Sequence, residues 1–344
     1  MNRIRMASNE NPFGPSPKAL QAIQRAITQC HFYPDNDSRE LRQKLAERFR
    51  VAPEQVLVAA GLSSLLGIIC RTLLRPGLNA VTSQRSFIVY QTATKAAGGE
   101  IIETPMKDDG FDLDAILAAI TPETRLVFLA NPNNPTGTLF HAAALDRFLD
   151  RVPEHVVVIV DEAYYEFAEY FAAQRTIEYS HSLDYVRQGR RVAVLRTFSK
   201  AHGLAGLRVG YGIGPAKLMA ELGRMRTTFS VSVPAQAGAS AALDDTPHIE
   251  LAVKNNADGA QFLLKELSGL GYRVVPTWAN FVYCELGEDA GAFAKRMQAE
   301  GILIRALGAW GAPTAIRVTI GTPEQNQRFL ATFKKVMPRT PSRV

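Results

Sequence analysis

The feature that most constrains the fold is an alternation of short β-branched runs with amphipathic stretches over the first two thirds of the chain. It predicts a largely parallel sheet with helices on both faces. The run Val156–Val160 is continuously apolar, which is typical of a strand covered on both sides. The predicted strands are Val56–Ala60, Ala80–Ser83, Glu100–Thr104, Leu126–Ala130, Val156–Val160, Val192–Thr197 and Leu207–Ile213, and the predicted helices are Ser63–Leu74, Tyr90–Ala97, Leu113–Ile120 and Ala142–Leu149.

The pattern changes after Pro234, where a long helical stretch precedes short strands and two further helices. This change predicts a smaller α+β domain. Its elements are expected at Pro247–Leu267, Tyr272–Val275, Phe281–Glu285, Ala290–Glu300, Leu303–Arg305, Ile316–Ile320 and Pro323–Val336. The proline-rich start predicts an irregular arm and a helix. We therefore expect an arm and helix at 1–28, a large domain at 29–236 and a small domain at 237–344.

Charge and composition narrow the class of ligand. The net charge is +6, but no cluster of five to eight Lys and Arg residues is present, which favours small anionic ligands over nucleic acid. No apolar run approaches a membrane span and no signal-peptide segment follows the N-terminus, so we expect a cytoplasmic protein without membrane partners. The cysteines Cys30, Cys70 and Cys284 are scattered, which predicts buried free thiols and no metal site.

Charged residues follow two of the predicted buried strands. Asp161-Glu162-Ala163-Tyr164 stands where ligands bind in open α/β sheets, although a helix cap or surface acid would look similar. Arg196-Thr197-Phe198-Ser199-Lys200 runs into a glycine-rich turn that carries Arg208 eight positions after the lysine. A partly desolvated lysine in such a turn can act as a nucleophile. Hydroxyls and a guanidinium can bind a phosphate.

Two further turns add candidate ligand donors. Asn131-Pro132-Asn133-Asn134-Pro135-Thr136-Gly137 forms a rigid loop in which an Asn amide can donate to a ligand oxygen. Gly61-Leu62-Ser63-Ser64 opens an apolar helix and can offer backbone N–H groups to an anion. Each turn is unremarkable by itself.

In this order and spacing, the four segments resemble the class I/II aminotransferases of the fold-type I pyridoxal-phosphate (PLP) enzymes. The resemblance is strongest to the histidinol-phosphate aminotransferase branch. It extends from Ser8-Asn9-Glu10-Asn11-Pro12 to Ile316-Arg317-Val318-Thr319-Ile320-Gly321, nearly the whole chain. It implies a large domain with a mostly parallel seven-stranded sheet between helices, and a smaller α+β domain.

The resemblance also implies residue roles. Lys200 would bond covalently to PLP and then move a proton, and Asp161 would pair with the ring nitrogen. Asn134 and Tyr164 would bind the ring oxygen, and Phe87 would stack on the ring. The cofactor phosphate would be held by Leu62, Ser63, Thr197, Ser199 and Arg208, and by Tyr33 from the partner of a homodimer with shared active sites. Substrate would contact Asn11, Asn280, Arg305 and Arg317, where Arg317 grips an α-carboxylate and Arg305 a phosphate.

The sequence departs from the branch near its substrate and phosphate contacts. Ser230 stands where those members usually carry Asn, and Gly61-Leu62-Ser63-Ser64 lacks the acidic pair that is common there. The expected reaction is of the histidinol-phosphate:2-oxoglutarate type, and an aromatic amino acid with its 2-oxo acid is the first alternative. Decarboxylation of an amino-acid phosphate is a second alternative. A non-enzymatic PLP-binding regulator is disfavoured because no helix-turn-helix segment precedes residue 30.

Overall fold

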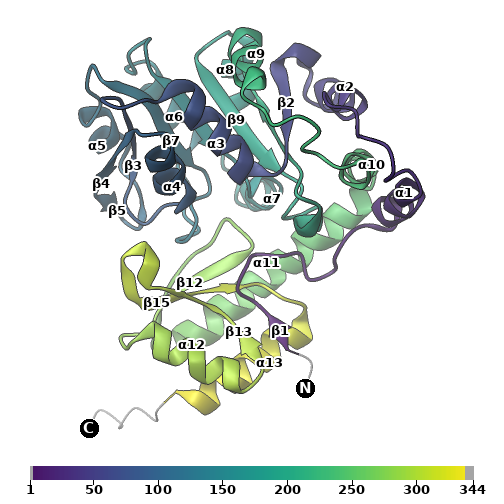
Figure 1. The fold of residues 1–344 in the computed structure, drawn as a ribbon. Coiled ribbons are helices and arrows are strands. Elements are labelled where there is room, and N and C mark those ends of the chain that lie inside the picture. Colours follow the sequence, from purple (N-terminus) through teal and green to yellow (C-terminus); the bar gives the residue numbers. More distant parts are fainter. Residues whose placement is uncertain (1–2, 338–344) are drawn as a thin grey trace.

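The computed structural model describes residues 3–337. Its largest element is a seven-stranded sheet in the order β2-β10-β9-β8-β7-β3-β4 (Figure 1). The neighbours from β9 to β4 run parallel, and β10 is antiparallel to both β2 and β9. The strands are β2 (Val56–Ala59), β3 (Asn79–Ser83), β4 (Glu100–Thr104), β7 (Thr124–Ala130), β8 (Val157–Asp161), β9 (Val192–Thr197) and β10 (Gly210–Ile213). The predicted seven-stranded α/β sheet is confirmed.

One predicted strand of this sheet was too long. The segment expected as a strand at Leu207–Ile213 becomes extended only at Gly210. A 3-10 turn at Ala205–Leu207 precedes it, and Arg208 adopts a left-handed conformation with φ 55°. That turn interrupts the extended backbone, and it brings Arg208 back toward Ser199.

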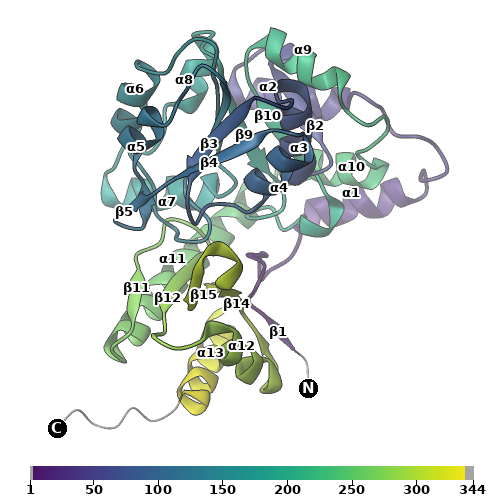
Figure 2. The ribbon, with the colours of Figure 1, turned by 60° about the vertical axis from the view of Figure 1, so that its left-hand side comes forward.

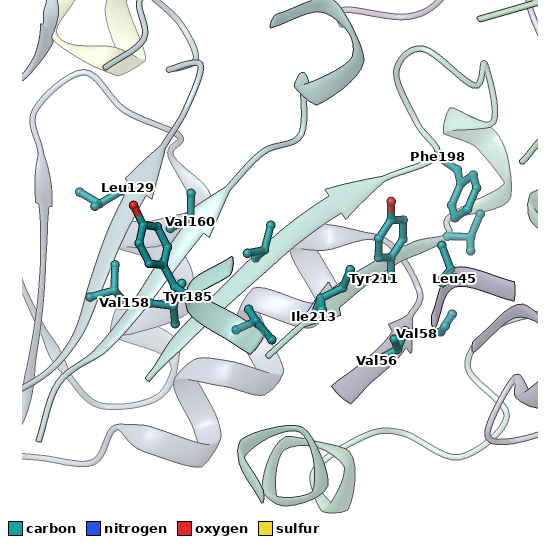
Figure 3. Packing of buried hydrophobic residues seen from close by; sticks show 14 of the residues in the cluster. Leu45, Val56, Val58, Leu129, Val158, Val160, Tyr185, Phe198, Tyr211 and Ile213 are labelled. Atoms are coloured by element: carbon teal, nitrogen blue, oxygen red, sulfur yellow. The ribbon is translucent and has the colours of Figure 1, made fainter. Parts of the chain in front are cut away.

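Helices cover both faces of the sheet (Figure 1). Alternate side chains of its strands point to opposite faces and pack into two separate hydrophobic clusters. One of these clusters includes Val58, Val158 and Tyr211 (Figure 3). Each fully buried aliphatic side chain stabilises the sheet by about 1.5–3 kcal/mol relative to an exposed one. Its helices are α2 (Arg39–Phe49), α3 (Leu62–Leu73), α4 (Val89–Ala96), α5 (Leu113–Ala118), α6 (Ala142–Leu149), α7 (Tyr165–Arg175), α8 (Ser182–Arg187) and α9 (Ala216–Arg224).

A second, four-stranded antiparallel sheet follows in the order β11-β12-β15-β14 (Figure 2). Its strands are β11 (Arg273–Val275), β12 (Phe281–Glu285), β14 (Arg305–Leu307) and β15 (Ala312–Thr319). The helices α11 (Thr246–Gly269), α12 (Ala290–Ala299) and α13 (Pro323–Val336) pack with it around a separate apolar cluster. The smaller α+β unit is thus present, while the predicted domain limits at 28/29 and 236/237 stay predictions, and residues 338–344 lie outside the described part.

The strand predicted at Leu303–Arg305 is divided between two sheets. Ile302–Leu303 forms β13, which pairs in parallel with β1 (Ile4–Arg5), and Arg305 begins β14. The N-terminal arm therefore joins the small unit before it continues into α1 (Pro17–Ile27), which packs on α10 (Val233–Ala242) (Figure 2). A β5–β6 hairpin (Met106–Lys107 and Gly110–Phe111) completes the strands.

Three composition-based expectations can be compared with residues 3–337. Cys70 and Cys284 are buried, but Cys30 is exposed because it follows the end of α1, so the prediction of buried thiols was wrong there. Among these residues no group of three or more His, Cys, Asp or Glu side chains is placed to hold a metal ion. In the same part of the chain, no helix combines the length and apolar character that a bilayer crossing requires.

Candidate active site

A cavity of about 420 Å³ lies at the carboxyl ends of β7, β8 and β9, between the two sheets. Most of the predicted site residues line it, namely Leu62, Ser63, Phe87, Asn134, Asp161, Tyr164, Thr197, Ser199, Lys200, Arg208, Arg305 and Arg317. The parallel strands explain this convergence, because their carboxyl ends meet at one edge of the sheet. Residues that are far apart in sequence are thus brought around one space.

Lys200 provides a nucleophilic amine at the end of β9. Its Nζ donates to the backbone oxygen of Ser8 at 3.0 Å and lies 5.7 Å from the centre of the Tyr164 ring. Burial, assisted by the positive charge of Arg317, lowers the pKa of Lys200 to about 7. A large part of the amine is therefore neutral near pH 7 and able to form a covalent bond.

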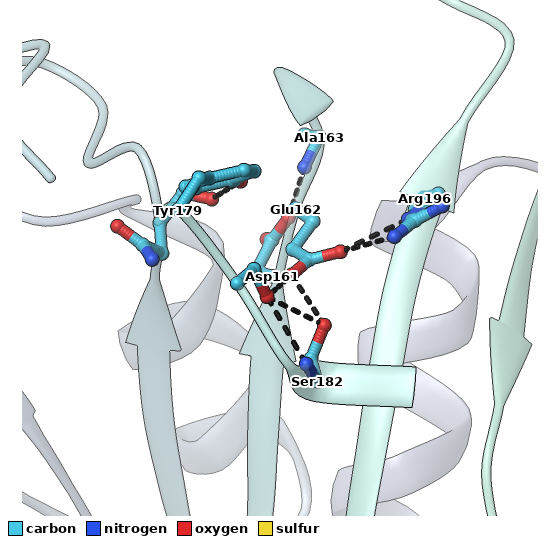
Figure 4. Close-up of polar contacts among 8 residues, drawn as sticks. Asp161, Glu162, Ala163, Tyr179, Ser182 and Arg196 are labelled. Carbon is cyan, nitrogen blue, oxygen red and sulfur yellow. Dashed lines mark hydrogen bonds and ion pairs between the residues drawn. The ribbon is translucent and has the colours of Figure 1, made fainter. Parts of the chain in front are cut away.

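Asp161 provides a buried carboxylate that faces the same cavity. It is 4% exposed, and burial raises its pKa to about 6. Oδ1 accepts from the backbone N–H of Ala163 at 3.1 Å, and Oδ2 accepts from the hydroxyl of Tyr90 at 2.7 Å. Figure 4 shows Asp161 beside Glu162, whose carboxylate turns instead to Arg196. The two neighbouring carboxylates therefore have different roles: Asp161 faces the cavity, and Glu162 pairs with Arg196.

Tyr164 and Asn134 both present polar groups to the cavity. The hydroxyl of Tyr164 accepts from Asn9 Nδ2 at 2.8 Å, which leaves its own proton available to a ligand. The Oδ1 atom of Asn134 accepts from Arg317 Nη1, so its amide N–H groups are free to donate. This pair can bind one oxygen of a flat ligand.

An anion cradle lies at the start of α3. Gly61 has φ 80° and precedes the N-terminal residues Leu62 and Ser63 of this helix. Thr197 Oγ1 donates to Ser199 Oγ at 3.0 Å, and Arg208 Nη1 lies 3.4 Å from the same oxygen. Backbone N–H groups, hydroxyls and a guanidinium around one point are the donors that a phosphate prefers.

Two arginines of the small sheet close the other side of the cavity. Arg305 and Arg317 are directly opposite each other on β14 and β15. Arg317 is 5% exposed, and its Nη2 donates to the backbone oxygen of Ala7 at 2.8 Å. Burial lowers the pKa of Arg317 to about 10, yet the group stays charged at neutral pH. The two guanidiniums can together hold a second anionic group.

Three predicted site residues lie outside the cavity. Asn11 donates from Nδ2 to the backbone oxygen of Ala201 at 2.7 Å, and Asn280 donates to that of Asn9 at 3.0 Å. Both amides thus hold the arm in place, and their predicted substrate contacts stay predictions. Tyr33 is 83% exposed and stacks on Phe229 with ring centres 4.6 Å apart. In a single chain it contributes nothing to the cavity.

The sequence reasoning missed several cavity residues. Tyr90 lies in the first turn of α4, three positions after Phe87, which precedes the helix. Ser8, Asn9 and Glu10 belong to the arm motif that drew attention only to Asn11. Trp310 and Ile88 could not be predicted as cavity residues, because a single apolar residue in a sequence usually belongs to the hydrophobic core.

Comparison with known proteins agrees with this geometry. Residues 2–333 match the family model described as aminotransferase class I and II. The chain is 44% identical to histidinol-phosphate aminotransferase 2 of Pseudomonas aeruginosa over 334 residues, which is 97% of this chain and 89% of that protein. It is 41% identical to the histidinol-phosphate aminotransferase of Moorella thermoacetica over 335 residues, covering 97% of this chain and 85% of the relative.

The crystal structure of histidinol-phosphate aminotransferase from Sinorhizobium meliloti, in complex with pyridoxal-5'-phosphate, superposes with a TM-score of 0.90 at 30% identity and covers 98% of this chain and 92% of that one. Aspartate aminotransferase from Thermus thermophilus with maleate has the same fold, with a TM-score of 0.85 at 24% identity. The expected fold-type I architecture is confirmed. The chain belongs to the class I and II aminotransferase family.

Proposed function

We propose that this chain is a PLP-dependent aminotransferase that moves an amino group between histidinol phosphate and a 2-oxo acid. One observation carries the proposal. An amine with a pKa near 7 (Lys200), a buried carboxylate (Asp161) and an anion cradle beside Arg208 surround a single cavity of about 420 Å³. The names of the relatives from Pseudomonas aeruginosa and Moorella thermoacetica support the choice of substrate.

The residues present fit PLP. The cofactor has an aldehyde, a basic ring nitrogen and a phosphate, and Lys200, Asp161 and the cradle match these groups by charge and donor type. The anion cradle also requires glycine at position 61, because a Cβ atom there would lie 2.4 Å from Arg208 Nη2. A side chain at position 61 would therefore push the Arg208 guanidinium away from the start of α3.

Bound PLP supplies an electron sink that stabilises negative charge on the carbon next to the amino group. The Lys200 amine, partly neutral at pH 7, would take the proton from that carbon and could then deliver it on the other side of the amino nitrogen. Asp161 holds a proton at the ring nitrogen, and Tyr164 donates from its hydroxyl to the ring oxygen. Arg317 fixes the substrate anion, so that the reacting C–H bond is held in one orientation.

The charge of the cavity favours ligands with more than one anionic group. Its lining includes the cations Lys200, Arg208, Arg305 and Arg317 and the acids Glu10 and Asp161. After the cofactor phosphate is bound at the cradle, Arg305 and Arg317 remain for a substrate phosphate or carboxylate. These two remaining arginines support a phosphorylated amino donor and a 2-oxo acid acceptor that bind in turn at the same site.

The direct test is to add single amino donors to the purified, PLP-loaded protein without any acceptor and to follow its absorbance. Histidinol phosphate should convert the yellow form to the pyridoxamine form. Conversion by phenylalanine and not by histidinol phosphate would replace the proposal with an aromatic aminotransferase. Release of CO2 from an amino-acid phosphate would indicate a decarboxylase, and a protein that takes up no PLP would refute the whole proposal.

Arg305→Ala tests the substrate phosphate contact. We expect the KM for histidinol phosphate to rise about 10- to 100-fold, because a charge-assisted hydrogen bond to phosphate is lost. The kcat/KM for phenylalanine should change less than about twofold. Arg273→Ala is the control, since Arg273 lies on the same sheet but is 53% exposed and binds Asp109. An equal loss with both amino donors would contradict a phosphate-specific role.

We also propose a homodimer with shared active sites. Six exposed large hydrophobic side chains occur in two stretches of the chain, 20–33 and 225–229, namely Leu20, Ile27, Phe32, Tyr33, Met225 and Phe229. Tyr33 and Phe229 stack, which joins the two stretches into one surface. An apolar surface of this kind supports a protein partner, and a second copy would bring Tyr33 to the neighbouring site.

Mixing two variants that are each defective at limiting PLP tests the shared site. We expect a dimer of about 75 kDa, twice the mass of the 37.7 kDa chain. Tyr33→Ala should weaken PLP binding about tenfold through the lost phosphate contact. At limiting PLP, unfolding and refolding Tyr33→Ala together with Lys200→Ala should restore activity, because one site of each mixed dimer is intact. A mixture no more active than its components would contradict sharing.

A further inference from the structure

Tyr90 is a buried side chain that the steps above do not use. It is fully buried, and its ring stacks on Phe128 of β7 with ring centres 4.8 Å apart and planes within 3°. Phe87 meets the same ring edge-on at 5.7 Å. Packing on two sides therefore fixes the direction of the hydroxyl, which donates to Asp161 Oδ2 at 2.7 Å.

The hydrogen bond from Tyr90 acts on a carboxylate with few other donors. Asp161 Oδ1 accepts from the backbone N–H of Ala163, and no other hydrogen bond to its side chain occurs within residues 3–337. The charged groups that influence it are Lys200, which favours its ionised form, and Glu162, which opposes it. Tyr164, whose pKa is raised by burial, is the other titratable neighbour. Tyr90 is thus the one side chain among these residues that donates directly to Asp161.

We propose that Tyr90 is a positioning residue that keeps the proton of the Asp161–cofactor pair on the ring nitrogen. The inference rests on the proposed use of PLP. Asp161 and the ring nitrogen share one proton, which can reside on either of them. A hydrogen bond to the carboxylate stabilises its ionised form, so the hydroxyl of Tyr90 lowers the affinity of Asp161 for that proton. The proton then stays on the ring, where it strengthens electron withdrawal.

The test compares Tyr90→Phe with wild type after loading with PLP that carries ¹⁵N in its ring. The nitrogen chemical shift on the low-pH plateau gives the share of the proton that resides on the ring. We expect the ratio of ring-bound to Asp161-bound proton to fall about tenfold in Tyr90→Phe, since a hydrogen bond that stabilises the ionised carboxylate is lost. The single-turnover rate with histidinol phosphate should fall about 10- to 100-fold, with little change in KM.

Tyr211→Phe is the matched control, because Tyr211 is a buried tyrosine of the same sheet that does not line the cavity. Its plateau shift should equal that of wild type. If Tyr90→Phe does not fold, 3-fluorotyrosine at position 90 keeps the ring and donates more strongly, so the share of the proton on the ring should rise. An unchanged plateau shift in either Tyr90 variant would overturn the proposal. A wild-type protein that binds no PLP would instead refute the proposed function.

Discussion

Lys200→Ala is expected to lower the rate of amino transfer by about 10⁴-fold or more and to remove the yellow absorbance of the covalently held cofactor. The variant loses both the amine that bonds to PLP and the group that moves the proton. Lys200 lies among cavity residues, and its amine makes one hydrogen bond, to the Ser8 backbone oxygen, within the described part of the chain. Absorbance spectra and single-turnover kinetics measure the two losses separately.

Two further variants separate the amine from its charge. Lys200→Arg keeps a cation but removes the neutral amine, so it should be as inactive as Lys200→Ala. Lys254→Ala should behave as wild type, because the Lys254 side chain is 67% exposed and binds Asp258 at the surface. Retention of more than about a tenth of the wild-type rate in Lys200→Ala would show that another residue moves the proton.

The lowered pKa of Lys200 predicts a pH dependence of cofactor uptake. Burial and the nearby charge of Arg317 disfavour the protonated amine, so its pKa falls to about 7. Below that pH the amine is increasingly protonated and unreactive, and above it the neutral form predominates. The rate at which the apo protein takes up PLP should therefore rise about tenfold per pH unit below 7 and level off above it. A rate that keeps rising to pH 10 would indicate an ordinary, solvated lysine.

The sequence predicted the large sheet because its strands are buried on both faces and separated by recognisable turns. It also predicted most of the cavity lining, since ligand-binding residues of such sheets follow the carboxyl ends of strands. Asp161 ends β8 and Lys200 follows β9, and these two strands pair in parallel. Local pattern and family resemblance therefore pointed to the same residues.

The missed features depend on tertiary contacts. The role of Tyr90 follows from the distance between α4 and β8, which no local pattern encodes. The division of Leu303–Arg305 between two sheets depends on β1, a strand nearly three hundred residues earlier in the chain. The hydrogen bonds of Asn11 and Asn280 to buried backbone oxygens of the arm or the loop beneath it could not be predicted locally either, and their substrate contacts stay predictions. These contacts depend on which buried polar groups need a hydrogen-bond partner in the folded chain.

Glu162→Ala is expected to lower the free energy of unfolding of the apo protein by about 3–5 kcal/mol, because it leaves a buried charge unpaired. Glu162 and Arg196 are fully or almost fully buried. Both Nε and Nη2 of Arg196 donate to Glu162 Oε2, at 2.9 and 2.8 Å (Figure 4). Ser180 and Ser182 donate to the other oxygen at 2.6 and 2.5 Å. One substitution therefore removes the partner of a charge and of two hydroxyls.

Urea unfolding of the apo variants measures this effect without any role for the cofactor. Asp150→Ala breaks the Arg190–Asp150 pair, whose side chains are 38% and 63% exposed, and should change the free energy by less than about 1 kcal/mol. If Glu162→Ala changes it equally little, the buried pair is not the stabilising contact that its geometry indicates.

The double variant Glu162→Leu/Arg196→Met separates stability from positioning. Replacing both partners removes the buried charges together, so its stability should lie closer to wild type than that of Glu162→Ala. The pair links the end of β8, which carries Asp161, to β9, which leads to Lys200. Arg196 also lies 3.3 Å from the centre of the Tyr165 ring, at the start of the helix that follows Asp161. A double variant that is stable but slow in amino transfer would therefore indicate that the pair holds these two reactive groups at their working separation.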